Sequence, residues 1–208
     1  MNMHALIVVS HPRPNSLTHA VAAEVAAGMI AADPTHSFEI ADLTAEGFNP
    51  GFSGADIAAH LKEAAPPADV LAEQARIARA DALVLVYPVY WWSMPGLLKG
   101  WIDRVFTNGW AYDDSSGNHV EKKLSHLPIH LVAIGGASLR TYARRGYFGA
   151  MRTQIDHGIF DYCGAPVQTS ELLVPADASA SARSHLDAAH AIGRRLFNLD
   201  GPATRSAA

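Results

Sequence analysis

The chain has 208 residues, 49% of them hydrophobic and 17% charged, a composition typical of one soluble globular domain with a large core. Its net charge of −4 argues against a nucleic-acid partner or an anionic membrane partner. The single cysteine, Cys163, excludes an internal disulfide and favours a reducing, cytoplasmic setting.

Apolar runs alternate with helical patterns in the first half of the chain. Residues 5–9 are all apolar but too few to span a membrane, so the run predicts a buried strand and no membrane insertion is expected. The expected elements are, in order, a strand over 6–10, a helix over 16–31, a strand over 37–43, an irregular loop over 44–53, a helical turn over 57–61 and a helix over 70–80.

The second half continues the alternation after one long connection. That connection, residues 107–125, is of a length that is usually functional or disordered. The expected elements are a strand over 82–87, a helix over 95–106, the connection, a strand over 128–134, a mainly helical segment over 140–160, a strand over 167–174 and a last helix over 177–196, capped near Asp177.

Strand and helix alternate throughout, which predicts an α/β fold with a parallel sheet and helices on both faces. Right-handed crossovers then favour the flavodoxin-like, doubly wound strand order 2-1-3-4-5. We expect one domain over residues 1–200 and a flexible tail over 201–208. The sequence lacks the dinucleotide fingerprint G-x-G-x-x-G, the P-loop and the H-E-x-x-H or paired-cysteine motifs of metal sites, so no metal is expected.

The loop after the first strand is rich in hydroxyl and basic residues and ends at a helix N-terminus. Such a terminus presents free N–H groups that suit one phosphate. Ser16 and Thr18 would add hydroxyl donors, while His11 and Arg13 would add positive charge. Alternatively, Ser16 or its neighbour Asn15 only caps the helix. Both interpretations stay open.

Residues 87–96 form a loop of aromatic residues and prolines at the carboxyl end of a predicted strand, where open α/β sheets bind ligands. Two adjacent indoles, Trp91 and Trp92, suit a flat aromatic ligand; a subunit interface is the alternative for one of them. In contrast, Trp101 lies at helical spacing with Leu97 and Val105, which predicts a place in the core.

A third loop follows the fourth predicted strand. Gly135 and Gly136 would let the backbone approach a planar ring closely, although a plain turn explains them equally well. Beyond them comes a basic cluster, which would neutralise a phosphate or form a solvated face: Arg140, Arg144 and Arg145.

Together these loops resemble those of the flavodoxin-like NAD(P)H:quinone oxidoreductases, the DT-diaphorase-like family. This family includes ancillary oxidoreductase subunits of glutathione-gated potassium-efflux antiporters. The resemblance runs over residues 5–178. Its most specific motifs are Pro88-x-x-Trp91, Pro95-x-x-Leu98-Lys99-x-Trp101-Ile102-Asp103-Arg104-Val105-Phe106 and Gly109-Trp110-Ala111-Tyr112.

The resemblance implies a non-covalent FMN or FAD, NADH or NADPH as electron donor, and two-electron reduction of a quinone-like acceptor. It places the flavin phosphate at His11, Ser16, Leu17 and Thr18. It places the flavin ring at Pro88, Val89, Tyr90, Trp91, Trp92, Ala133, Ile134, Gly135 and Gly136. Tyr142 corresponds to the catalytic tyrosine that faces the flavin carbonyl edge.

The chain departs from the family at Phe148, where the DT-diaphorase branch has a histidine six residues after the tyrosine, so a tyrosine–histidine relay does not carry over. The resemblance also implies a homodimer, and we expect residues 107–125 and the helix over 95–106 to contribute to its interface. Two alternatives to an NAD(P)H-dependent quinone reductase stay open: an electron carrier of the flavodoxin type, and a regulatory subunit of a potassium-efflux antiporter.

Overall fold

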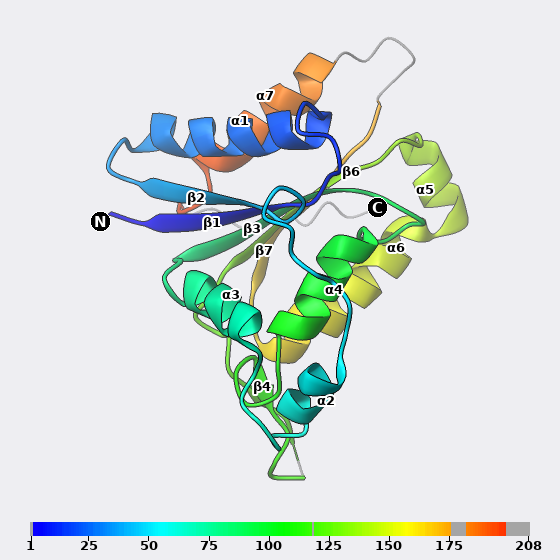
Figure 1. The fold of residues 1–208 in the computed structure, drawn as a ribbon. Helices are drawn as coiled ribbons and strands as arrows, with labels where there is room; N and C mark the ends of the chain where they lie inside the picture. The colour runs from blue at the N-terminus through cyan, green and yellow to red at the C-terminus, as the bar shows by residue number, and fades with distance from the viewer. Residues whose placement is uncertain (1, 118, 176–181, 199–208) are drawn as a thin grey trace.

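Five parallel strands form one sheet in the computed structural model, which describes residues 2–117, 119–175 and 182–198 (Figure 1). From edge to edge the strands are β2 (Ser37–Asp42), β1 (His4–Val9), β3 (Ala82–Pro88), β6 (Ile129–Ile134) and β7 (Val167–Leu173). Numbered along the chain, this is the order 2-1-3-4-5, so the predicted flavodoxin-like arrangement is confirmed.

Helices cover both faces of the sheet, as predicted. Figure 1 shows α1 (Leu17–Ala32) and α7 (Ala182–Arg194) side by side on one face. On the other face lie α3 (Ala68–Ala78), α4 (Gly96–Val105) and α6 (Tyr147–Arg152). Because both faces are covered, β1 and β3 are continuous apolar runs rather than alternating ones.

Each face has its own hydrophobic cluster. Val21, Val25 and Met29 of α1 pack in the first, under α7. Leu98 and Trp101 of α4 pack in the second. Trp101 is 0% exposed, which confirms its predicted place in the core, and its Nε1 donates a hydrogen bond to a buried carboxylate of α3.

Two loops are more ordered than the sequence suggests. The connection over 107–125 carries a short antiparallel pair, β4 (Tyr112–Asp113) and β5 (Glu121–Lys122). Helix α2 (Gly54–His60) begins three residues before the predicted turn because Ser53 and Asp56 form a reciprocal capping box.

The segment expected to be helical over 140–160 is interrupted at Gly146, whose φ of +71° is the left-handed conformation that glycine adopts without strain. Helix α5 (Leu139–Arg145) ends there, and α6 then continues into a π-helix, η1 (Thr153–Asp161). The predicted cap at Asp177 and the tail over 201–208 lie outside the described residues.

Glycines set the close crossing of α1 and α7. A Cβ built on Gly193 would lie 2.0 Å from the carbonyl oxygen of Val25. We expect Gly193→Ala to lower the free energy of unfolding by roughly 1–3 kcal/mol, because two backbones must move apart to admit one methyl group. Urea unfolding measures this. Gly149→Ala is the control: nothing lies within 4 Å of a Cβ at Gly149 in α6, so that variant should be neutral or slightly stabilising.

Within the described ranges, no helix combines the length and hydropathy that crossing a membrane requires.

Candidate functional site

The three predicted loops all leave the sheet at the end where its parallel strands finish, which we call the carboxyl edge. Strand β3 lies between β1 and β6, with Val86 opposite Val9 and Pro88 opposite Ile134. The backbone N–H of Val89 donates to the carbonyl of Ile134 at 2.8 Å, which joins the second loop to the third. The parallel register therefore gathers the predicted residues of all three loops at the carboxyl ends of neighbouring strands.

In the first loop, Ser16 is the N-cap of α1, and its Oγ accepts a hydrogen bond from the backbone N–H of His19. This confirms that Ser16 caps the helix, which is one of the two interpretations of this loop. His11 Nδ1 accepts from the N–H of Arg13 at 3.0 Å and closes the turn before the helix. Leu17 is half-buried and Thr18 is buried, so both face the protein more than the solvent.

The first loop also contains a hydrogen-bonded chain that sequence reasoning missed. His19 Nδ1 lies 2.8 Å from Ser16 Oγ, and His19 Nε2 lies 2.9 Å from the carboxylate of Asp42 at the end of β2. Burial raises the pKa of Asp42, but His19 and two backbone N–H groups outweigh this and bring it below its ordinary 3.8. An ionised Asp42 therefore orients the imidazole that holds Ser16.

The second loop is a tight turn with unusual backbone. Trp91 and Trp92 have φ values of +50° and +60°, a left-handed conformation that is strained for bulky residues. Paired backbone hydrogen bonds of 3.1 Å between Tyr90 and Ser93 close the turn. Trp91 is 93% exposed. Trp92 is half-buried and stacks on Tyr147 of α6, a residue that was not predicted from the sequence.

The third loop depends on a glycine. A Cβ at Gly135 would lie 2.5 Å from the hydroxyl of Tyr142, so only glycine lets that hydroxyl approach the end of β6. Gly136 is exposed, and a Cβ at that position would meet nothing within 4 Å, whereas Ala133 is buried. The ring of Tyr142 meets that of Trp92 edge-on at 5.2 Å. Burial raises the pKa of Tyr142 and keeps its phenol protonated at neutral pH.

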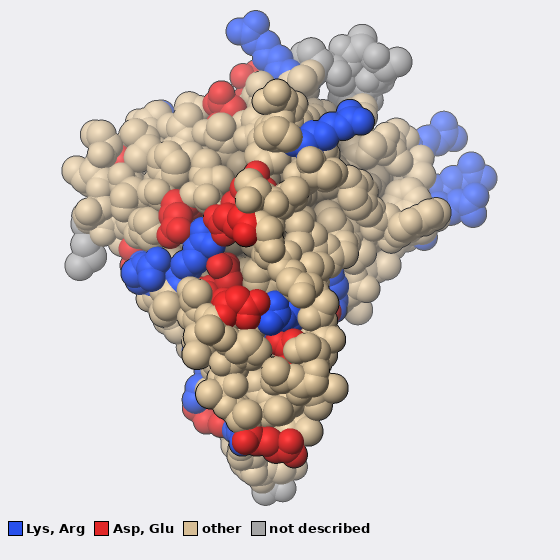
Figure 2. Space-filling view, viewed as in Figure 1, with Lys and Arg blue, Asp and Glu red and all other residues tan. Residues whose placement is uncertain are grey.

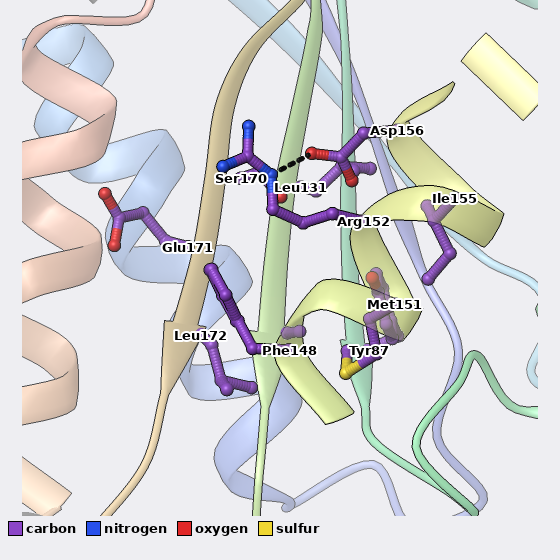
Figure 3. A pocket seen from close by; sticks show the side chains of 11 residues that line it. Tyr87, Leu131, Phe148, Met151, Arg152, Ile155, Asp156, Ser170, Glu171 and Leu172 are labelled. Carbon is purple, nitrogen blue, oxygen red and sulfur yellow. Dashed lines mark ion pairs between the residues drawn. The ribbon is translucent and has the colours of Figure 1, made fainter. Parts of the chain in front are cut away.

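A small cavity lies against the sheet beneath α6 and η1 (Figure 3). Its volume of about 10 Å³ is close to what one water molecule requires. Phe148 is part of its wall, together with Tyr87 of β3 and Leu172 of β7. Phe148, which stands where the DT-diaphorase branch is expected to have a histidine, is therefore packed against the sheet.

Asp156 faces this cavity and is only 5% exposed. Its Oδ2 lies 3.4 Å from Arg152 Nε (dashed in Figure 3) and accepts no hydrogen bond from the described residues. Burial raises the pKa of Asp156 above its ordinary 3.8. When the pKa of a carboxyl is raised by folding, the free energy of unfolding of the protein falls as the pH increases from the ordinary pKa through the raised value.

We therefore expect Asp156→Asn to stabilise the protein by about 1 kcal/mol at pH 7, because it removes a buried charge with an oxygen that accepts no hydrogen bond. The gain should shrink as the pH falls and vanish at about pH 3, below the ordinary pKa of 3.8, where the carboxyl is protonated in the folded and the unfolded chain alike. Urea unfolding at both pH values measures the difference. Asp161→Asn, an exposed aspartate of the same π-helix, should change stability little at either pH. A loss of stability in Asp156→Asn at pH 7 would contradict the expectation.

The basic cluster of α5 is solvated. Its three arginines are exposed, and the ion pairs found within the described part of the chain include none of them. Figure 2 shows blue side chains projecting from the right edge, where α5 lies. The described His, Cys, Asp and Glu residues form no group of three or more that would hold a metal ion.

Comparison with known proteins finds the same fold. A family described by its flavodoxin-like fold matches residues 3–195. A solved NAD(P)H:quinone oxidoreductase from Methanothermobacter marburgensis is 28% identical, with a TM-score of 0.85 over 94% of this chain and 100% of that one. General stress protein 14 from Treponema denticola, solved in complex with FMN, is 25% identical, with a TM-score of 0.61 over 91% of this chain and 99% of that one.

Among curated proteins, ribosyldihydronicotinamide dehydrogenase [quinone] from Mus musculus is 29% identical over 147 residues. The alignment covers 67% of this chain and 62% of the mouse enzyme.

Proposed function

The chain belongs to the family with the flavodoxin-like fold, and from that membership we propose that it is a flavin-dependent NAD(P)H oxidoreductase that reduces quinones or similar acceptors. One observation carries the proposal. The carboxyl ends of β3 and β6 bring together an indole, a protonated phenol and an open glycine backbone, at Trp92, Tyr142 and Gly136. This combination suits a planar, redox-active ring rather than a phosphate alone.

The residues at the carboxyl edge of the sheet fit a flavin. Trp91 and Trp92 offer apolar rings, and the open Gly136 allows close approach of the backbone. The N-terminus of α1, with Ser16, would hold a phosphate of FMN or FAD. When bound, the flavin supplies the chemistry: it accepts a hydride from NADH or NADPH and passes two electrons to the acceptor. Tyr142 would donate a hydrogen bond to the ring edge that becomes negative.

The spectrum of the purified protein tests this proposal. We expect flavin absorption, FMN or FAD identified by mass after release, and steady consumption of NADH or NADPH when a quinone is added. A colourless protein that rejects added flavin would refute the proposal. Flavin-loaded protein without turnover would favour the electron carrier instead.

The exposed arginines of α5 can be tested as a site for the 2′-phosphate of NADPH. If replacing them lowers kcat/KM for NADPH but not for NADH, they bind that phosphate.

A homodimer is part of the same proposal. Apolar side chains are exposed on and beside α2, at Phe52, Ile57 and Leu61, each about half exposed or more. Figure 2 shows few charged side chains on the surface at α2. An apolar surface of this kind at α2 favours a subunit interface. Light scattering that gives a monomer at working concentration would contradict it.

The hydrogen-bonded chain at the start of α1 yields a test of where the phosphate binds. We expect His19→Leu to weaken FMN binding about tenfold, because it removes the imidazole that contacts Ser16 Oγ and leaves Oδ2 of Asp42 without its partner. Riboflavin, which lacks the phosphate, should bind the variant and the native protein equally. Titration of the apoprotein with each flavin measures both affinities.

His4→Leu is the matched control, since His4 makes a similar 2.9 Å pair with Ser37 Oγ at the opposite end of β1. It should leave both affinities unchanged. If His19→Leu weakens riboflavin and FMN equally, the first loop does not hold the phosphate.

A further inference from the structure

The turn that carries Trp91 and Trp92 is held from outside itself. Two consecutive non-glycine residues with left-handed φ persist only where surrounding structure fixes them. Within the turn, the backbone hydrogen bonds join Tyr90 to Ser93 but fix no indole. What orients the ring of Trp92 must therefore come from its neighbours.

Those neighbours lie on the helical segment that packs against the turn. The ring of Tyr147 stacks on Trp92 with centroids 3.7 Å apart and planes 12° from parallel. Ser93 Oγ donates a hydrogen bond to Gln154 Oε1 of η1. Tyr142 of α5 touches only the edge of the indole, at 85°. One face of Trp92 is therefore covered by Tyr147, so a planar ligand that stacks on this indole would use the other face.

The placement of Tyr147 follows from the break at Gly146. The left-handed glycine ends α5 and starts α6, so Tyr147 is the first residue of a new helix direction. Its neighbour Phe148 is instead part of the wall of the cavity in Figure 3. Trp92 and Tyr147 are both half-buried, so the pair lies at the surface of the hydrophobic cluster that contains Trp101, and not inside it.

We propose that Tyr147 is a positioning residue that fixes the indole of Trp92 as a wall of the flavin site. The inference rests on the proposed function and names a residue and a contact beyond it. Tyr147 acts through stacking, so its ring matters and its hydroxyl does not.

A double-mutant cycle on Tyr147 and Trp92 tests the inference. The readouts are the dissociation constant for FMN and the rate at which NADPH reduces the bound flavin. We expect Tyr147→Leu to weaken binding, slow reduction, or both by about threefold to tenfold, the range that an aromatic pair is worth in such cycles. In a Trp92→Leu background the same change should have no further effect. Tyr147→Phe, which keeps the stack, should stay within about twofold of the native protein.

Phe197→Leu is the control, because it removes another half-buried ring, packed against His36 at 4.9 Å on the opposite face of the sheet. It should leave both readouts unchanged. Tyr147→Met replaces Tyr147→Leu if the latter fails to fold. Additive losses in the cycle, or a Tyr147→Phe variant as impaired as Tyr147→Leu, would overturn the positioning role alone. A native protein that binds no flavin would instead overturn the proposed function on which it rests.

Discussion

Replacing Arg104 with leucine should lower the free energy of unfolding by about 3–5 kcal/mol, because it leaves a buried carboxylate without its cation. Arg104 is 5% exposed and Asp56 is 1% exposed, and Arg104 Nε donates to Asp56 Oδ1 at 3.0 Å. The same guanidinium donates to both oxygens of Asp69 and to the carbonyl of Asn49. One side chain of α4 thus ties down α2, α3 and the loop between β2 and α2.

Urea unfolding of the native protein and the variant measures the loss. Lys99→Met is the control on the same helix: Lys99 pairs with Asp103, but both side chains are more than 40% exposed, so its loss should cost less than about 0.5 kcal/mol. A cost below about 1 kcal/mol for Arg104→Leu would show that Asp56 is satisfied by Ser53 alone.

The same network predicts an acid dependence. Burial opposes ionisation of Asp56, but hydrogen bonds from Ser53 and Arg104 outweigh it and hold the pKa below the ordinary 3.8. Arg104 does the same for the pKa of Asp69. Carboxyls with lowered folded pKa values stabilise the fold above the ordinary value, and this contribution is lost as the pH falls below it. The native protein should therefore lose stability below pH 4 more steeply than Arg104→Leu.

The fold was predictable because its signals are local. Continuous apolar runs such as the one in β3 predict strands buried on both faces, and crossover handedness then leaves few strand orders. Trp101 was assigned to the core from helical spacing alone. What escaped was also local but weaker: the capping box at Ser53 and Asp56, and the left-handed Gly146, which looks like any other glycine in sequence.

Only part of the candidate site could be predicted from the sequence. Its loops follow strands, so their common edge follows from the topology. The pairs His19–Asp42 and Trp92–Tyr147, however, join residues 23 and 55 positions apart and depend on how elements pack. The spacing of Ser16 and His19 was the one available signal, because it matches the capping pattern with histidine at the third position. Tyr147 offered no signal beyond being an aromatic residue after a glycine.

Tyr142→Phe should slow reduction of the bound flavin by NADPH by roughly 10²-fold, the usual effect of removing one donor to a charge that develops during reaction. Tyr142 is 1% exposed, so phenylalanine can take the place of its ring and the fold should hold. The hydroxyl lies against Gly135 at the end of β6, where the flavin ring is proposed to bind. Because burial raises the pKa of Tyr142, the phenol remains a donor across the neutral range.

Anaerobic mixing of flavin-loaded protein with NADPH, followed by flavin absorption, measures this rate directly. Flavin content should match that of the native protein, because the hydroxyl is required for the charge that forms and not for holding the ring. Tyr162→Phe removes a hydroxyl from a half-exposed tyrosine paired with Tyr112 and should leave the rate unchanged. With phenylalanine at position 148, Tyr142 has no histidine six residues on to share its task. If Tyr142→Phe is as fast as the native protein, the Gly135–Gly136 amides or an arginine stabilise the charge instead.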